Sequence, residues 1–159
     1  MTIRLQNVAP LLLSLLLSSP ALAQAGKAKS PPDYPTISAR SYTGGSITVK
    51  TTGAFLLDKE IPINDKASYS DGEKTWLQYG ASGSKEGDVL ITYGDQEIGI
   101  IFGSGSSTAT AESQHCTGYA EVTAKSITGS YSCKGVTAYD RSTGKMSPVA
   151  VTVTFSAKS

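Results

Sequence analysis

The stretch that decides the fold is Cys116-Thr-Gly-Tyr-Ala-Glu-Val-Thr-Ala-Lys-Ser-Ile-Thr-Gly-Ser-Tyr-Ser-Cys133. If the chain folds back at Ala124-Lys125 as an antiparallel hairpin, the two cysteines lie directly opposite each other. In that register the apolar and small side chains share one face, and a shift by one residue would mix them with the polar ones. That face contains Cys116, Gly118, Ala120, Val122, Ile127, Gly129, Tyr131 and Cys133. The hydrophobic pattern therefore predicts the register of the hairpin.

The same register predicts a disulfide between Cys116 and Cys133. A metal site built on these two thiols would lack ligands, because the chain has two cysteines and a single histidine, His115. Two cysteines in an exported chain indicate one bridge. Tyr131 also lies opposite Gly118, a pairing in which an aromatic ring covers exposed backbone.

The first 25 residues have the pattern of a secretory signal peptide. Arg4 precedes an apolar run at 9–17, and small residues follow at 18–23. This order predicts cleavage after Ala23 or Ala25. Since the apolar run is shorter than the roughly 20 residues that a membrane span needs, we expect a secreted or periplasmic protein with no membrane span.

Residues 26–37 contain three prolines and almost nothing that a core could bury, which predicts a flexible linker. Residues 38–159 then form one domain. Turn residues recur throughout that domain, and apolar residues alternate with polar ones at the period of a strand. The clearest alternation is at 149–157, where the odd-numbered positions are apolar.

Further strands are expected at 46–51, 54–63, 67–70, 74–79, 88–93, 97–102 and 107–112, and the cysteine hairpin continues through 136–139. We expect 107–112 to be an edge strand, because its pattern is weak. Pro62 places its end of 54–63 at an edge or bulge, because proline cannot donate a ladder hydrogen bond. This series of short strands predicts an all-β fold, a single antiparallel β-sandwich or alternatively a small closed β-barrel.

The charge balance argues against nucleic acid as a partner. The chain has 14 basic and 13 acidic residues, and removing the signal peptide takes only Arg4, so the two signs then balance. A neutral surface of mixed sign lacks the basic patch that phosphate backbones or anionic membranes attract.

The sequence predicts no catalytic residue, cofactor or metal site. His115 has neither a nucleophile nor an orienting carboxylate beside it, which favours a surface histidine. The acidic residues lie in or beside turns, and the closest spacings, at 86–88 and 95–97, each supply two oxygen ligands, fewer than a calcium loop needs.

Trp76, Gln78 and Tyr119 form the candidate binding surface. If Leu77 and Tyr79 point inward, Trp76 and Gln78 are exposed, and a tryptophan beside an amide suits sugar stacking or a protein contact. The lone tryptophan of a β-sandwich is more often part of the core, so we favour burial of Trp76. Tyr119 lies on the polar face of the hairpin and is expected to be exposed.

These features favour a secreted, non-enzymatic β-sandwich module with a binding or structural role in the bacterial envelope. Its partner would be a protein or a glycan. One alternative is a polysaccharide-acting hydrolase that uses loop carboxylates, which would gather acids in one cleft. Another is a β-barrel carrier of a small apolar ligand, which would enclose an apolar cavity.

Overall fold

The computed structural model describes residues 38–94 and 97–159. The predicted signal peptide at 1–25 and the linker at 26–37 lie outside the described residues, as do Asp95 and Gln96 in the predicted turn between two strands. No α-helix occurs in the described part of the chain, so the all-β class is confirmed there. The same residues contain no helix that is long and apolar enough to span a bilayer.

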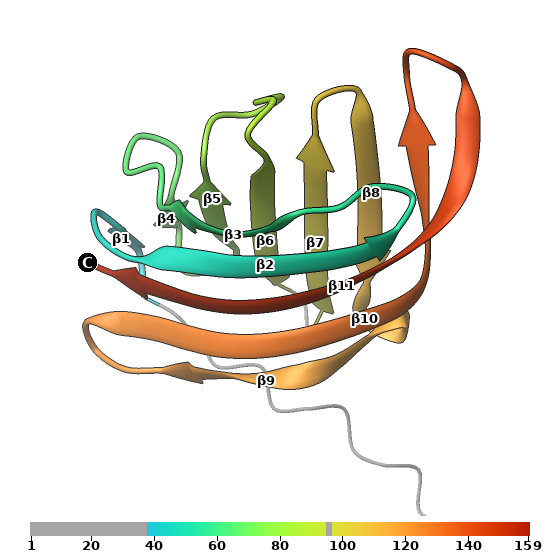
Figure 1. Cartoon of the computed structure of the whole chain (residues 1–159). Coiled ribbons are helices and arrows are strands. Elements are labelled where there is room, and N and C mark those ends of the chain that lie inside the picture. The colour runs from blue at the N-terminus through green and yellow to red at the C-terminus, as the bar shows by residue number, and fades with distance from the viewer. Residues whose placement is uncertain (1–37, 95–96) are drawn as a thin grey trace, which may run out of the picture. The chain divides into compact units, whose positions relative to one another are not determined.

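The described strands form one antiparallel sheet that curls into a half-barrel (Figure 1). Its path runs β1-β4-β5-β6-β7-β8-β10-β11-β2-β3, and β9 pairs with β10 beside that path. The elements are β1 (Arg40–Ser41), β2 (Ser46–Gly53), β3 (Asp58–Pro62), β4 (Tyr69–Ser70), β5 (Thr75–Tyr79), β6 (Asp88–Gly94), β7 (Glu97–Ser104), β8 (Ser107–Glu112), η1 (Ser113–His115), β9 (Cys116–Val122), β10 (Ser126–Asp140) and β11 (Lys145–Lys158).

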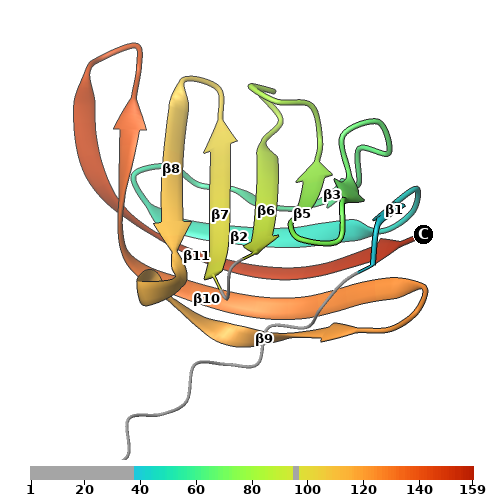
Figure 2. The ribbon, with the colours of Figure 1, turned by 180° about the vertical axis from the view of Figure 1, so that it is seen from behind.

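The curl produces two layers whose strands cross (Figures 1 and 2). We name them the β6 layer, with β1 and β4–β8, and the β11 layer, with β2, β3, β9, β10 and β11. Between them lies the hydrophobic core, to which every strand with an alternating pattern contributes its inward positions. The large side chains that are fully buried include Tyr42, Ile47, Val49, Leu77, Tyr79, Val89, Ile91, Phe102, Ile100, Ile127, Val136, Val151 and Val153.

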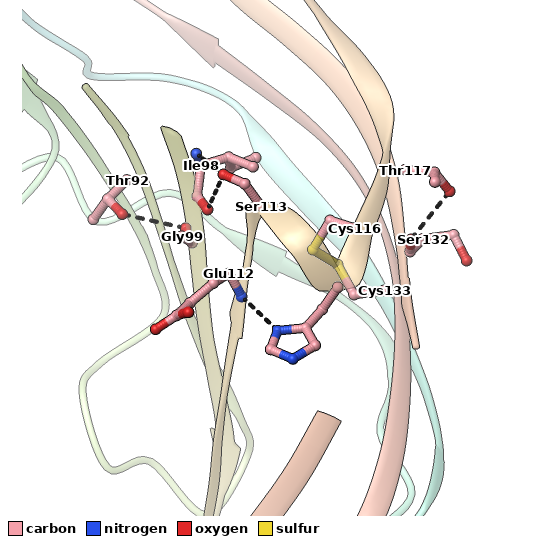
Figure 3. The surroundings of a disulfide bond; sticks show 10 residues. Thr92, Ile98, Gly99, Glu112, Ser113, Cys116, Thr117, Ser132 and Cys133 are labelled. Atoms are coloured by element: carbon pink, nitrogen blue, oxygen red, sulfur yellow. Dashed lines mark hydrogen bonds between the residues drawn. A yellow bond between two sulfur atoms is a disulfide. The ribbon is translucent and has the colours of Figure 1, made fainter. Parts of the chain in front are cut away.

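The cysteine hairpin has the predicted register. Cys116 pairs with Cys133, Gly118 pairs with Tyr131, and the disulfide joins strands whose Cα atoms are 4.0 Å apart (Figure 3). The predicted covering of glycine by tyrosine is also present, because a Cβ added to Gly118 would lie 2.6 Å from the ring of Tyr131. The predicted inward set of the last strand is buried as well, with Val149, Val151, Val153, Phe155 and Ala157 at most 4% exposed.

Two strand predictions need correction. Residues 107–112 form β8, which lies between β7 and β10 and is therefore not an edge strand. Of the segment 54–63, only Asp58–Pro62 pairs as β3. The preceding residues form a loop because the hydroxyl of Thr51 donates to the Phe55 carbonyl and accepts from the Leu57 N–H, each at 2.8 Å. As predicted for a strand that carries Pro62, β3 ends the path of the sheet.

The long strand β10 connects the two layers. Its first part pairs with β9 and its last three residues pair with β8, so two different strands share one edge of β10. The register of β10 against β11 shifts between Cys133 and Val136, and Gly135 there has a φ of 72°. Such a bulge bends a strand and increases its twist. The bend therefore carries β10 from the β11 layer into the β6 layer (Figure 1).

Candidate aromatic binding site

Five side-chain positions form a row across the outer face of the β6 layer, the face turned to the viewer in Figure 2. The strand registers place Tyr69 beside Trp76, Trp76 beside Thr92, Thr92 beside Gly99 and Gly99 beside Glu112. Residues that are directly opposite in antiparallel strands share a face. The row therefore brings residues from five strands onto one surface.

Trp76 is half-buried on this outer face, and the expectation that it belongs to the core is wrong. Leu77 and Tyr79 take the inward positions of β5 and are fully buried. Burial also raises the pKa of Tyr79, whose hydroxyl donates to the Ser156 carbonyl at 3.1 Å. Because alternate residues of a strand point to opposite faces, Trp76 is directed outward.

The Trp76 ring is stacked on a second aromatic ring and also lines a hollow. Tyr69 stacks on Trp76 with the ring centroids 4.8 Å apart and the ring planes at 24°. Beside Trp76 lies a hollow of about 230 Å³, which we name the aromatic hollow. It is lined by Lys74, Trp76, Thr92, Tyr93, Gly94, Glu97, Ile98, Gly99 and Glu112.

Glycines keep the floor of the aromatic hollow low. A Cβ on Gly99 would lie 2.7 Å from the Thr92 Oγ1, which donates to the Gly99 carbonyl at 3.3 Å. A Cβ on Gly94 would lie 2.7 Å from the Cγ of Lys74. Since side chains stand roughly perpendicular to a sheet, Trp76 rises as a wall above this floor.

The far side of the aromatic hollow is polar. Glu112, at the end of β8, is exposed, and its Oε2 accepts a hydrogen bond from the Gln114 Nε2 at 2.6 Å. Its backbone N–H donates to the Nδ1 of His115 at 3.2 Å, which anchors the short turn before the disulfide (Figure 3). Glu97 and Lys74 supply further charges to the lining. The hollow thus combines an aromatic wall with charged groups that can accept or donate hydrogen bonds.

The three predicted binding residues do not form one site. Gln78 shares the outer face with Trp76 but is only 9% exposed, and its amide Nε2 donates to the Tyr79 carbonyl at 3.4 Å. Tyr119 is 60% exposed, as expected, but it points outward from β9 in the β11 layer. Trp76 and Tyr119 therefore lie on different layers, with outward faces that point away from each other.

A second hollow, of about 560 Å³, lies farther along the same strands. We name it the arginine hollow; it is lined by Ser82, Gly83, Asp88, Ile101, Gly105, Ser107, Thr108 and Arg141. Partial burial raises the pKa of Asp88, while a hydrogen bond from the Gly83 backbone and the charge of Arg141 act in the opposite direction. A Cβ on Gly103 would lie 3.3 Å from the Asp88 Oδ1 and 3.4 Å from the Thr108 Oγ1, so both oxygens border the same low point of the sheet.

His115 and the disulfide form no reactive pair. The imidazole is half-buried and its Nδ1 accepts the Glu112 backbone N–H, while both sulfur atoms are bonded to each other. Within residues 38–94 and 97–159, no three side chains of histidine, cysteine, aspartate or glutamate are grouped so that they could hold a metal ion.

Sequence reasoning missed Thr92, Gly99 and Glu112 in the aromatic hollow, and it missed Arg141. The available signal was the pair of predicted hairpins around Asp71-Gly72 and at 88–102. One hairpin aligns Tyr69 with Trp76, and the other aligns Thr92 with Gly99. The alignment of Trp76 with Thr92 comes from the pairing of β5 with β6, which joins the two hairpins. Comparison of the chain with known proteins gives no match, either to a protein-family model, to a curated protein or to a solved structure.

Proposed function

We propose that the protein is an exported, non-enzymatic binding module that holds a glycan in the aromatic hollow. The observation that carries this proposal is the Trp76 ring, which is stacked on Tyr69 and lines a hollow with a polar rim. Binding sites for small molecules combine an apolar or aromatic wall with a few placed polar groups. The aromatic hollow has both.

The chemistry of a sugar ring fits this arrangement. The C–H groups on one face of a pyranose ring are apolar and slightly positive, so they pack against the negative face of an aromatic ring. The hydroxyl groups around the ring edge need hydrogen-bond partners, which the carboxylates of Glu97 and Glu112 and the ammonium of Lys74 can provide. A pyranose ring that lies against Trp76 can make the apolar contact and the polar contacts at the same time.

The charges of the aromatic hollow favour neutral glycans over anionic ones. Two carboxylates, Glu97 and Glu112, face one ammonium group, Lys74, so the lining carries an excess of negative charge. A polymer of uronic acids would place its own carboxylates near these groups, and like charges at close range raise the free energy of binding. We therefore expect neutral polysaccharides to bind best.

Binding is favoured over hydrolysis because neither hollow holds the pair of carboxyls that a glycosidase needs, one of them shielded from water as the acid. Asp88, whose pKa is raised by burial, is the single carboxyl that lines the arginine hollow, and the charge of Arg141 acts on it in the opposite direction. Glu97 and Glu112 of the aromatic hollow are both exposed, so neither has the water-shielded setting of a catalytic acid. A carrier of an apolar ligand is disfavoured because large side chains such as Tyr42, Tyr79 and Phe102 occupy the interior between the layers.

The two crossed layers are proposed to act as a β-sandwich whose outer face presents the site, in a protein exported to the periplasm or the medium. The disulfide supports export, because such bonds persist in oxidising compartments. The intact mass of the secreted product should correspond to a chain that begins at Gln24 or Gly26. A secreted product that retains Met1 would contradict cleavage.

The binding proposal can be tested by fluorescence, because Trp76 is the only tryptophan of the chain. Hexasaccharides of glucose, xylose, mannose and N-acetylglucosamine are titrated into the protein. At least one of these hexasaccharides should change the fluorescence emission of Trp76 along a saturable curve. Polygalacturonate should bind more weakly than that hexasaccharide. Trp76→Ala, followed by calorimetry, should lower the affinity ten-fold or more, because truncating an aromatic anchor at the centre of a binding site typically costs about 2 kcal/mol or more. Trp76→Phe should recover part of it.

Tyr119→Ala is the matched control, since it removes an exposed aromatic ring from the other layer. It should leave the affinity unchanged. Loss of binding in Tyr119→Ala with normal binding in Trp76→Ala would move the site to the β11 layer and overturn the proposal. Absence of binding to all four neutral hexasaccharides would also overturn it. Release of shorter sugars from the bound hexasaccharide would show that the protein is a hydrolase.

A further inference from the structure

The arginine hollow lies on the same outer face as the aromatic hollow. Asp88 and Thr92 are both outward residues of β6, and Gly99 and Gly103 are their partners on β7. Four residues of strand separate Asp88 of the arginine hollow from Thr92 of the aromatic hollow, which is about 14 Å at 3.4 Å per residue. This distance exceeds the width of one pyranose ring. A single sugar unit therefore cannot occupy both hollows.

The surface between the two hollows is a half-exposed aliphatic strip. Leu90 and Ile101 are paired across β6 and β7, and Ile101 is 37% exposed. Thr110 of β8 continues this row beside Ile101 and is exposed. No charged side chain belongs to this row of described residues. The C–H faces of successive sugar rings can therefore pack along it without removing water from an ion.

The arginine hollow offers the polar groups that an added sugar needs. Arg141 supplies up to five N–H donors, and Asp88 and Thr108 supply oxygen acceptors beside a low point at Gly103. The turn that carries Arg141 is held in place, because the Arg141 backbone N–H donates to the Ser106 carbonyl at 3.0 Å. The Asp140 carboxylate also accepts from the Ser142 N–H at 2.8 Å and from the Thr143 hydroxyl at 3.0 Å.

We infer that the arginine hollow is a second subsite for the same ligand, and that the ligand is a polysaccharide chain running along β6 and β7. This inference rests on the proposed function and specifies its ligand as a polymer rather than a single sugar or a disaccharide. One end of the bound segment stacks on Trp76, the middle crosses Leu90 and Ile101, and the other end is hydrogen-bonded by Arg141 and Asp88.

Calorimetry with the disaccharide and the hexasaccharide of each of the four neutral sugars tests the inference. For the sugar that binds, the hexasaccharide should bind at least ten-fold more tightly than the disaccharide. Arg141→Ala should reduce this ratio to nearly one, and Asp88→Asn should reduce it in part. Arg141 is exposed, so its removal should leave the unfolding curve unchanged. Lys125→Ala is the control, because it removes one positive charge from the exposed turn between β9 and β10.

The outcomes separate this inference from the proposed function. Equal affinities for the disaccharide and the hexasaccharide would overturn the second subsite while leaving the aromatic hollow as the binding site. A strong length dependence that survives both Arg141→Ala and Asp88→Asn would also overturn it, because the added contacts would then lie elsewhere. Failure of every sugar to bind would overturn the proposed function itself, and the inference with it.

Discussion

Val153 lies in the middle of the β11 layer, where its exposed fraction is zero. It pairs with Tyr131 of β10 on one side and with Val49 of β2 on the other, and both neighbours are buried. Its chain neighbour Thr152 points to the opposite face and is exposed. Val153 lies on the buried face of the β11 layer and Thr152 lies on the exposed face. Substitution of these two adjacent residues therefore compares the two faces of one strand.

Val153→Asp should abolish cooperative folding. An unpaired buried carboxylate costs several kcal/mol, a large part of the total stability of about 5–15 kcal/mol that is typical of a domain. Thr152→Asp should change the free energy of unfolding by no more than about 0.5 kcal/mol, because it lies on the exposed face. Urea denaturation followed by circular dichroism measures both. Equal damage from the two substitutions would mean that the outer face of β11 is covered.

At the scale of elements, the hairpin of β9 and β10 has a register that does not depend on its disulfide. Ile127 is fully buried and Tyr131 nearly so, and their partners on β9 have smaller side chains. Outside the hairpin, Arg40 of β1 donates from its Nη1 to the Ala124 carbonyl at 2.6 Å and so holds the turn. The bridge is therefore one of several constraints on the hairpin.

The double variant Cys116→Ala/Cys133→Ala should keep the fold but melt at a lower temperature. The bridge spans 17 residues, for which chain entropy gives about 3 kcal/mol. We expect a smaller loss of stability, because the unfolded chain without the disulfide keeps some of the strand pairing of the hairpin. The disulfide then removes less conformational entropy from the unfolded state than this figure assumes. Thermal unfolding should show a decrease on the order of 10 °C, with an unchanged circular dichroism spectrum at 20 °C.

A direct check of the bridge is thiol labelling of the denatured, unreduced protein. No thiol should react before reduction and two should react after it. Two reactive thiols before reduction would contradict the bridge and would make Cys116, next to His115, a candidate for reactivity.

For the domain as a whole, the decisive feature is the bend of β10. Beyond the bulge, Ala138 pairs with Ala109 of β8 while the same strand continues to pair with β11. The two layers are therefore joined through β10 and through β11, which stays paired with it across the bend, as well as through their shared core. The turn that follows this bend carries Arg141 to the outer face of the β6 layer, so the bend also completes the arginine hollow.

Gly135→Val should destabilise the domain by about 1–3 kcal/mol, because its φ of 72° is unfavourable for a β-branched residue. Apart from its two chain neighbours, no residue has an atom within 4 Å of a Cβ added there, so the cost arises from the local backbone conformation. Gly135→Asn is the matched control and should cost less, because asparagine tolerates this conformation better. Urea denaturation should rank the variants in that order. A neutral Gly135→Val would show that the bulge can adopt another backbone conformation.

The sequence by itself determined the features that depend on local periodicity. Alternation at 149–157 identified the buried face of β11, and the apolar face of the hairpin identified its register and its disulfide. These features are readable because residues two apart along a strand share a face, and because a tight turn aligns the strands on either side of it.

Only the tertiary structure decided the direction of Trp76 and the composition of the site. The sequence offered two alternating sets on β5, and the core took Leu77 and Tyr79 because the space between the layers accommodates their side chains. Glu112 reaches the aromatic hollow through the pairing of β7 with β8, and Arg141 reaches the outer face through the bend of β10. These placements combine pairings between several strands across the sheet, and a local pattern carries no information about that combination.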